Sequence, residues 1–452
     1  MLDPKKNPQC VETGFQLPDF WDRSVTFFAN LKSIFFGNDE QTKELAQEVG
    51  EIDSYGGRLA PVINLIYPGG DNTLLLEHPP DSALLGYFRN ELNLSLPRIV
   101  QLSHEDYSNL TPNKNELRKL LGRDLEWVDG YVTDPRLCEW AQMGGGQTVS
   151  TPEGSRHGNN KRMLHQFLAE QGLPLPDTHI AADTADVGKA LKSLEQLGYR
   201  NAVIRAALGA SGVGMQKVSI ENSHKKEPIP LPKMLFHDGP CLVQGWIEPG
   251  VNGVTSVTSP SVQLFLDDSQ VHLYDITDQI LSAHSVHEGN HSPPLEMAAD
   301  LQRELINQAK VAGRWLHDQG YRGTASADFL VVEREGKTID VHVCEINARI
   351  TGATYPSVLG RHLLPNGAWM MQNLRLEEPL EGQKLLDLIR NSQWLFEKNA
   401  SRGVVPINFN FDKHGKTRKC QFLCLDSNVE SCREIMTAMV KSLPFKTRIE
   451  RD

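Results

Sequence analysis

The stretch from Asp328 to Arg349 constrains the fold of this chain more than any other. It contains two apolar runs that flank a polar segment around Gly336. This composition is typical of two antiparallel strands joined by a turn. Side chains alternate between the two faces of a strand, so we expect Glu345, Asn347 and Arg349 on one face. Asp328 is expected to reach the same face from the neighbouring strand.

The chemistry of these four side chains indicates a site for a divalent cation and a phosphate. Carboxylate and amide oxygens are ligands that suit Mg²⁺, which usually keeps positions for nucleotide phosphates and water. An adjacent arginine can stabilise the charge on a transferring phosphoryl group. The alternative is an exposed hairpin with charges on its solvated face, because any half-buried hairpin alternates polar and apolar residues. Features elsewhere in the chain decide between the two.

The overall composition excludes some classes of protein. A chain of 452 residues is too long for one hydrophobic core and implies two or three domains. With 39% hydrophobic and 23% charged residues, it has the composition of an ordinary globular protein. A formal net charge of -11 argues against a dedicated nucleic-acid binder, which needs a concentrated basic surface. We therefore expect no nucleic-acid partner.

The cysteines favour a reducing compartment. There are seven, scattered along the chain, which is typical of reduced cytoplasmic thiols. Cys420 and Cys424, with Cys432 nearby, raise the alternative of a zinc site, but their spacing favours a strand with buried or edge-facing cysteines. We find no signal peptide and no run long enough to span a bilayer, so we expect a cytoplasmic protein without a transmembrane segment.

The first 150 residues are expected to form an α/β unit preceded by a helix. Residues 20–36 carry aromatic residues at mostly helical intervals, which predicts an amphipathic helix docked on the first domain. Binding to a membrane surface is its alternative. Strands are expected at 61–67, at 98–102 and near 128–132. The first ends in glycines without the G-x-G-x-x-G spacing, so we expect a Rossmann-like region without its own cofactor.

A glycine-rich segment is the second strong signal. A boundary at 143–160 precedes expected helices at 161–171 and 184–197, then a strand at 202–205 and a loop at 209–214. Glycines allow backbone N–H groups to surround phosphate oxygens. The alternative is a glycine-rich hairpin without a ligand, and the Walker A ending is missing. The phosphate-binding candidates here are Arg205, Gly209, Ser211, Gly212 and Gly214.

Two later segments also suggest ligand contacts. The apolar strand and turn at 242–250 can offer backbone groups to an adenine edge, and Glu248 is the candidate for the ribose, with an exposed turn carboxylate as the alternative. The nucleotide candidates of this connector are Gln244, Trp246, Ile247 and Glu248. Residues 283–292 include three histidines; metal ligation is the alternative, but the glycine and the prolines that follow favour a mobile loop near the substrate.

The order of these features resembles the ATP-grasp superfamily of carboxylate-amine ligases over residues 159–368. The resemblance rests on Asn160-Lys161, on the Arg205 strand with its glycine loop, on the connector, and on Glu345-Ile346-Asn347-Ala348-Arg349 with Asp328 upstream. Residues 350–356 and 364–369, with a strand, turn and strand at 404–425, are most similar to the branch with a pre-ATP-grasp domain, which includes pheganomycin-type peptide ligases.

The resemblance implies roles for particular residues. Asp328, Glu345 and Asn347 match the Mg²⁺ ligands, and Arg349 the catalytic residue that touches the transferred phosphate and acyl group. Lys161 and Arg205 occupy the positions of the two phosphate-binding lysines, so Arg205 changes the donor geometry there and is also a catalytic candidate. Gln244-Gly245 replaces residues that are often acidic. The implied cofactors are ATP and two Mg²⁺ ions, and Mn²⁺ is compatible with the same ligands.

The implied architecture mixes α/β and α+β units. Its parts are an N-terminal helical segment (1–50), a Rossmann-like pre-ATP-grasp domain (51–150), a small ATP-grasp lobe with the glycine loop (151–245), a large lobe with the metal site (246–375) and a β-containing C-terminal extension (376–452).

The implied function is ATP-dependent amide or peptide bond formation through an acyl phosphate, with release of ADP and phosphate. A kinase of the same fold that phosphorylates a small-molecule hydroxyl, and a non-catalytic nucleotide-binding module, are the alternatives. The expected partners are a carboxylate and an amine of amino-acid or peptide type, and a homodimer is compatible with the sequence. Ser357, Arg361 and His362 either contact substrate or belong to an ordinary helix surface.

Overall fold

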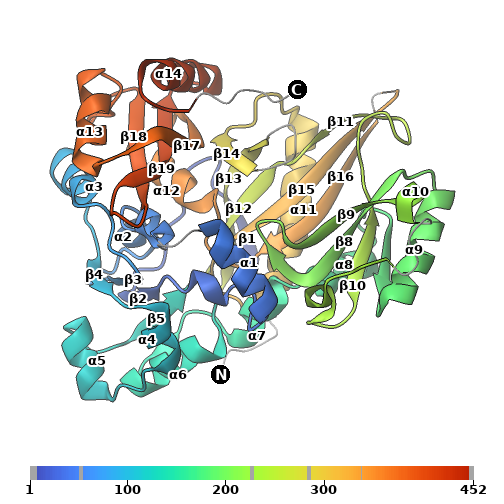
Figure 1. The fold of residues 1–452 in the computed structure, drawn as a ribbon, viewed down its shortest axis with the longest axis horizontal. Coiled ribbons are helices and arrows are strands. Elements are labelled where there is room, and N and C mark those ends of the chain that lie inside the picture. The colour runs from blue at the N-terminus through green and yellow to red at the C-terminus, as the bar shows by residue number, and fades with distance from the viewer. Residues whose placement is uncertain (1–7, 50–53, 224–228, 282–286, 337, 447–452) are drawn as a thin grey trace.

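The fold is built on three sheets. The computed structural model describes residues 8–49, 54–223, 229–281, 287–336 and 338–446. These residues form sheets of ten, four and five strands. In Figure 1 the four-stranded sheet lies at the right, the five-stranded sheet at the lower left, and the ten-stranded sheet runs from the middle to the C-terminal strands at the upper left. None of the helices within these ranges is long and apolar enough to cross a lipid bilayer.

The five-stranded sheet is parallel, with strand order β4-β3-β2-β5-β6. Short strands at its centre are buried on both faces, as is usual when helices cover a parallel sheet. Its strands are β2 (Val25–Phe28), β3 (Thr73–Leu76), β4 (Arg98–Gln101), β5 (Trp127–Gly130) and β6 (Gln147–Thr148). The helices of this part are η1 (Leu31–Ser33), α1 (Asp39–Val49), η2 (Tyr55–Leu59), α2 (Ile63–Ile66), α3 (Ser82–Gly86), η3 (Tyr87–Glu91), α4 (His104–Asn109), α5 (Lys114–Leu121) and α6 (Pro135–Gly144).

Two sequence-based expectations in this part are wrong, and two are confirmed. The expected amphipathic helix at 20–36 is instead an extended segment with the central strand β2, whose Val25, Phe27 and Phe28 are buried. The expected strand at 61–67 is a turn followed by the short helix α2. The strands expected at 98–102 and near 128–132 are present as β4 and β5.

The four-stranded sheet is antiparallel, with order β7-β10-β8-β9. Helices α8 and α9 confirm the two helices expected before the glycine-rich segment. That segment is a tight hairpin: β8 continues to Ala210 and β9 begins at Val213. The elements are α7 (Pro152–Gly158), α8 (Lys161–Glu170), β7 (Thr178–Ala181), α9 (Thr184–Gln196), β8 (Asn201–Ala210), β9 (Val213–Ser219), α10 (Ile220–Ser223), η4 (Lys233–Phe236) and β10 (Cys241–Gly245).

The ten-stranded sheet contains the hairpin expected near Gly336, formed by β15 and β16. The expected C-terminal strand, turn and strand are β18 and β19. Its strands are β1 (Gln9–Glu12), β11 (Val254–Thr258), β12 (Ser261–Leu266), β13 (Gln270–Leu281), β14 (His287–Ser292), β15 (Gly323–Arg334), β16 (Ile339–Asn347), β17 (Ala368–Leu380), β18 (Gly403–Phe411) and β19 (Thr417–Asp426). Its helices are α11 (Ala299–Asp318), α12 (Thr354–Leu363), α13 (Gly382–Asn391) and α14 (Val429–Ser442).

The three-histidine segment differs from the mobile loop that the sequence indicated. Residues 282–286 lie outside the described residues, but 287–292 form strand β14, which pairs with β13 and β17. A Cβ added at Gly289 would lie 1.9 Å from the Met371 carbonyl oxygen. The glycine therefore permits close strand packing rather than loop flexibility. Cys420 and Cys424 are buried in β19, which confirms the strand expected there.

Candidate active site

The acidic and amide side chains of the β15–β16 hairpin converge. In the antiparallel register Asp328 lies opposite Glu345, and Ser326 opposite Asn347. The Asn347 amide nitrogen is 2.7 Å from Asp328 Oδ2 and 3.4 Å from Glu345 Oε1. A β-bulge follows Asp328. The three side chains that the sequence selected as metal ligands therefore share one surface.

Two serines that the sequence pattern did not reveal support Asp328. Ser261 Oγ donates to Asp328 Oδ1 at 2.7 Å, and Ser326 Oγ donates to the same oxygen at 3.1 Å. Ser326 precedes Asp328 by two residues on one strand, so the same period-two argument would have found it. Ser261 comes from β12, whose pairing with β15 was not readable from the sequence. Together the hydroxyls fix the orientation of this carboxylate.

Two cations from the facing elements contact Glu345. Lys161 Nζ is 3.1 Å and Arg205 Nη2 is 2.7 Å from Glu345 Oε2. Lys161 is the first residue of α8, whose N-terminus is capped by the Asn160 side chain. Arg205 lies within β8. Residues selected on three separate segments therefore meet at one carboxylate.

The two carboxylates of the site have opposite pKa shifts. Burial raises the pKa of Asp328 to about 6, and the negative charge of Glu345 adds to this effect. Burial alone would also raise the pKa of Glu345, but the charges of Lys161, Arg205 and Arg349 outweigh it and hold that pKa at about 2. Burial lowers the pKa of Lys161, and Glu345 opposes this shift. Glu345 is therefore the permanently ionised member of the pair.

Arg349 is held at the edge of the cluster by Asn159. Arg349 Nη1 donates a short hydrogen bond to Asn159 Oδ1. The Asn159 amide nitrogen donates to Ser155 O at 2.8 Å and to Ala348 O at 3.2 Å. Asn159 was not selected from the sequence as a site residue, although it directly precedes the Asn160-Lys161 pair. Its amide is anchored by these two carbonyls and thereby orients Arg349.

The donor set fits Mg²⁺, with one rearrangement. Two carboxylates and an amide are hard oxygen ligands, and a cation between Asp328 and Glu345 would relieve their mutual repulsion. Asn347 turns its amide nitrogen toward both carboxylates, so ligation through its oxygen requires the amide to turn over. Within the described ranges no group of three His, Cys, Asp or Glu residues gathers around a common point. The remaining ligands of a metal here would have to be phosphate oxygens and water.

The glycine-rich hairpin meets the site at one residue. Lys161 Nζ donates to Gly209 O at 2.7 Å. Ser211 and Gly212 form the exposed turn, both with positive φ, of 54° and 83°. A Cβ added at Gly214 would lie 2.2 Å from Nε2 of Gln41 on α1. The hairpin is therefore held between Lys161 on one side and helix α1 on the other.

The connector after β10 reaches the site through Gln244. Gln244 Oε1 accepts a hydrogen bond from Arg205 Nη1 at 3.2 Å. The Trp246 N–H donates to Asn201 O at 3.0 Å, so this backbone donor is already used. Ile247 is partly buried beside it. Glu248 accepts from Asn201 Nδ2 at 2.7 Å and pairs with Lys217 Nζ at 3.3 Å. The ribose candidate is thus engaged with protein partners.

Two of the three residues selected after the motif, Ser357 and Arg361, do not lie on an ordinary helix surface. Arg361 forms a buried ion pair with Asp275, with Nη2 2.9 Å from Oδ1. The Ser357 hydroxyl donates to the same carboxylate. Ser357 and Arg361 are both buried, whereas His362 is exposed. The Asp275 cluster therefore accounts for Ser357 and Arg361 as structural residues.

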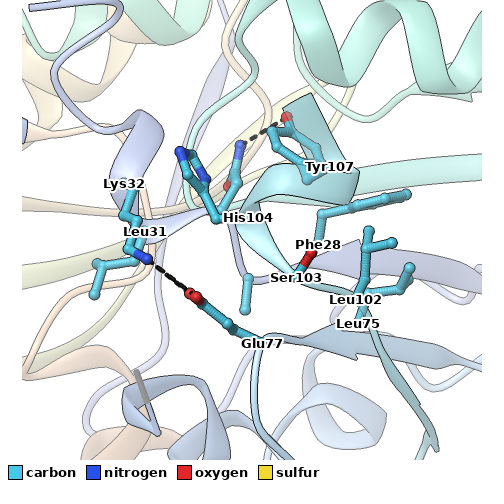
Figure 2. Close-up of a pocket in the computed structure, with 11 residues that line it drawn as sticks. Phe28, Leu31, Lys32, Leu75, Glu77, Leu102, Ser103, His104 and Tyr107 are labelled. Carbon is cyan, nitrogen blue, oxygen red and sulfur yellow. Dashed lines mark hydrogen bonds and ion pairs between the residues drawn. The ribbon is translucent and has the colours of Figure 1, made fainter. Parts of the chain in front are cut away.

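A crevice at the carboxyl ends of β2, β3 and β4 is too small for a nucleotide. Figure 2 shows the ion pair that crosses it, with Lys32 Nζ 2.9 Å from Glu77 Oε2. Its lining also includes Ser103, His104 and Tyr107. Its volume is about 30 Å³, which is room for about one water molecule. The position is one where open α/β sheets bind ligands, but the side chains close it.

Comparisons with known proteins find one related sequence and many similar folds. The chain matches no family model. It is 25% identical over 289 residues to a butirosin acyl-carrier protein–L-glutamate ligase of Niallia circulans, covering 63% of this chain and 62% of that protein. The chain thus spans less than two thirds of the length of this curated relative.

Solved structures share the fold over nearly the whole chain. The N5-carboxyaminoimidazole ribonucleotide synthetase of Thermus thermophilus has a TM-score of 0.57 and 11% identity, covering 95% of this chain and 100% of the other. The biotin carboxylase–ATP complex of Campylobacter jejuni has a TM-score of 0.56 and 13% identity, covering 94% and 92%. At these identities, the likenesses show that the chain shares the fold of these two enzymes.

Proposed function

We propose that the chain is an ATP-dependent carboxylate-amine ligase. The observation that carries this proposal is the meeting of Asp328, Glu345 and Asn347 with Lys161 and Arg205 from facing elements. Structural neighbours were solved with ADP, with ATP or with MgADP, which supports a nucleotide at the same place in the fold. We propose Mg²⁺ as the metal, with two ions, and Mn²⁺ as a substitute.

The mechanism follows from charge and position. A substrate carboxylate attacks the γ-phosphorus of ATP, the bond to the bridging oxygen breaks, and ADP leaves. An amine then attacks the acyl carbon, phosphate departs, and the amine proton passes to solvent. Asp328, Glu345 and Asn347 would hold Mg²⁺, which would neutralise charge on the phosphates. The protein contributes mainly orientation and electrostatic stabilisation, as is general for phosphoryl transfer.

Individual residues have distinct tasks in this proposal. Lys161 and Arg205 exchange the Glu345 oxygen for phosphate oxygens when the nucleotide binds, which frees Glu345 for the metal. Arg349, oriented by Asn159, stabilises the charge on the transferred phosphoryl group and the acyl phosphate. Gly209 at the hairpin base, which already contacts Lys161, covers the phosphates and limits access of water.

The proposed substrates are an amino-acid or peptide carboxylate and an amine. The curated relative is named for L-glutamate and an acyl-carrier protein. We therefore place L-glutamate among the first acids to be tested, and amines of amino acids and of carrier-bound groups among the acceptors.

The test is ADP formation that requires both an acid and an amine. Purified protein with ATP and Mg²⁺ should release ADP and phosphate only when a matching pair is added. Glu345→Gln should lower turnover by at least about a hundredfold, because it removes a charge shared by two cations and the metal. Glu335→Gln, in the exposed turn of the same hairpin, is the matched control and should leave turnover unchanged. Turnover by Glu345→Gln at the wild-type rate, or ADP release with a hydroxyl compound instead of an amine, would contradict the proposal.

A further inference from the structure

Arg58 has no carboxylate partner among the residues that the structure describes. It lies on η2, with its guanidinium carbon 4.9 Å from the Tyr355 ring centroid, 5.5 Å from that of Tyr55 and 5.8 Å from that of Tyr131. Its Nε donates to Tyr131 Oη at 3.4 Å. Among the described residues no aspartate or glutamate pairs with it, and the side chain is only partly covered. Aromatic faces stabilise the charge but use few of the five N–H donors.

Unsatisfied polar atoms gather around the same arginine. The Tyr355 hydroxyl, Asn408 Oδ1 and Gln421 Oε1 are all buried without a well-formed hydrogen bond to the part of the chain that the structure describes, and the Tyr355 hydroxyl lies within reach of Arg58 and Gln421. Asn408 and Gln421 are direct partners across β18 and β19, and α12, which carries Tyr355, packs against β19. A Cβ at Gly57, the residue before Arg58, would lie 2.5 Å from Asn408 Oδ1.

This arrangement is costly unless a ligand completes it. A buried donor or acceptor that lacks a partner loses its hydration without compensation, and a half-buried cation without a counter-ion adds to the loss. The donors, Arg58 and the Tyr355 hydroxyl, suit a carboxylate. The acceptors, the amide oxygens of Asn408 and Gln421, suit an ammonium group. Together, these donors and acceptors are complementary to the carboxylate and ammonium groups of an amino acid.

The cluster is connected to the catalytic hairpin on one side through α12. Tyr355 follows Arg349 by six residues, and its neighbour Thr354 donates to Gln263 Oε1 at 3.4 Å. Gln263 Nε2 donates to Ser261 Oγ at 3.0 Å, and that hydroxyl donates to Asp328. A substrate held by Arg58 is thereby fixed to the same framework as the metal-binding carboxylate.

The second connection runs through the five-stranded sheet. Tyr131 directly follows β5, and the Thr133 N–H donates to Ser155 Oγ at 3.0 Å. The Ser155 carbonyl accepts from Asn159, which orients Arg349. Arg349, the proposed catalytic residue, is therefore connected to the Arg58 cluster through this second series of contacts.

We propose that Arg58 and the Tyr355 hydroxyl bind a substrate carboxylate that is not phosphorylated, while Asn408 and Gln421 accept from its ammonium group. The substrate class is an amino acid with a second, free carboxylate. The inference rests on the proposed ligase function for the role of the ligand, but the site itself can be tested by binding alone.

The experiment compares the full-length wild type with Arg58→Met. L-glutamate, glutarate (which lacks the ammonium group) and inorganic phosphate are added separately, and the melting temperature and the affinity for MgATP are measured. Wild type should be stabilised by L-glutamate more than by either control ligand. Arg58→Met should weaken L-glutamate binding by about ten- to a hundredfold, because one charge-assisted contact is lost. Its MgATP affinity should not change. Arg89→Met, an exposed arginine on η3, is the matched control.

The outcomes separate a binding role from a structural one. Removing an unpaired cation should leave the ligand-free melting temperature of Arg58→Met equal to or above that of wild type. A lower melting temperature with an unchanged response to L-glutamate would show that Arg58 only packs against tyrosines. An equal response of wild type to phosphate and L-glutamate would show a general anion site and overturn the proposal. Failure to bind MgATP with retained L-glutamate binding would refute the ligase function but not this site.

Discussion

At the scale of single residues, the site depends on two carboxylates whose pKa values are shifted in opposite directions. Burial and the Glu345 charge raise the pKa of Asp328 to about 6, above its ordinary value of 3.8. An acid whose pKa is raised by folding contributes its stability while it is protonated, and this contribution is lost as the pH rises from about 4 through about 6. Metal binding requires the ionised form, so the affinity for Mg²⁺ should fall below pH 6.

We therefore predict that Asp328→Asn gains stability relative to wild type as the pH rises. Without metal, the difference in the free energy of unfolding should be small near pH 4 and reach on the order of 2 kcal/mol at pH 7, because asparagine cannot ionise. Thermal and urea unfolding between pH 4 and pH 8 would measure it. Addition of Mg²⁺ and ATP at pH 7 should stabilise wild type only. A difference that does not depend on pH would contradict the assigned titration.

At the scale of elements, the glycine-rich hairpin is positioned by helix α1. Gln41 is buried, and its Nε2 donates to Leu208 O at 3.0 Å. The same nitrogen occupies the space that a side chain at Gly214 would need. Lys161 holds Gly209 O from the other side. The position of the hairpin relative to the proposed phosphate site is thus fixed by two hydrogen-bond donors, Gln41 on α1 and Lys161 on α8.

We predict that Gln41→Met loosens this hairpin without unfolding the protein. Methionine keeps the volume but loses the hydrogen bond, so amide exchange at 206–214 should quicken and the KM for MgATP should rise about fivefold, corresponding to one ordinary hydrogen bond. Gln47→Met, exposed on the same helix, is the control. Equal exchange at 206–214 in both variants would show that α1 only covers the hairpin.

The predictability of each element depends on whether its signal is local. The acidic hairpin was readable because period-two alternation and the turn at Gly336 are both local features. The expected helix at 20–36 failed because β2 is buried on both faces, so its aromatic run has no strand alternation. Gly289 was interpreted as a loop residue because the close approach of Met371 is a tertiary contact. Asn159, Ser261 and Arg58 have roles that only the packed structure shows.

At the scale of the molecule, one hydrophobic core joins segments that are far apart in the sequence. Phe27 of β2, Tyr87 of η3 and Phe409 of β18 belong to the same buried cluster. The Tyr87 hydroxyl donates to Phe396 O at 2.6 Å. The four-stranded sheet has its own separate core, around Leu191 and Val243. The expected C-terminal extension at 376–452 is therefore packed on the N-terminal part. The body of the four-stranded sheet is energetically more independent, whereas Ala210 and Val213 of the glycine hairpin belong to the shared cluster.

We predict that a cavity in the shared core will destabilise strands from both ends of the chain. Phe409→Ala should lower the free energy of unfolding by about 3–5 kcal/mol, because Phe409 is fully buried. Hydrogen exchange should then quicken in β2 and β3 as well as in β18 and β19, but not in β8 and β10, since local stability follows cooperative units. Leu197→Ala, at a residue that is 52% exposed, is the control and should change neither. Faster exchange confined to β18 and β19 would show that the C-terminal strands unfold alone. If the response instead spans both ends and spares β8 and β10, the body of the four-stranded sheet is a separate cooperative unit that can move while the rest of the molecule stays folded, as closure over a nucleotide requires.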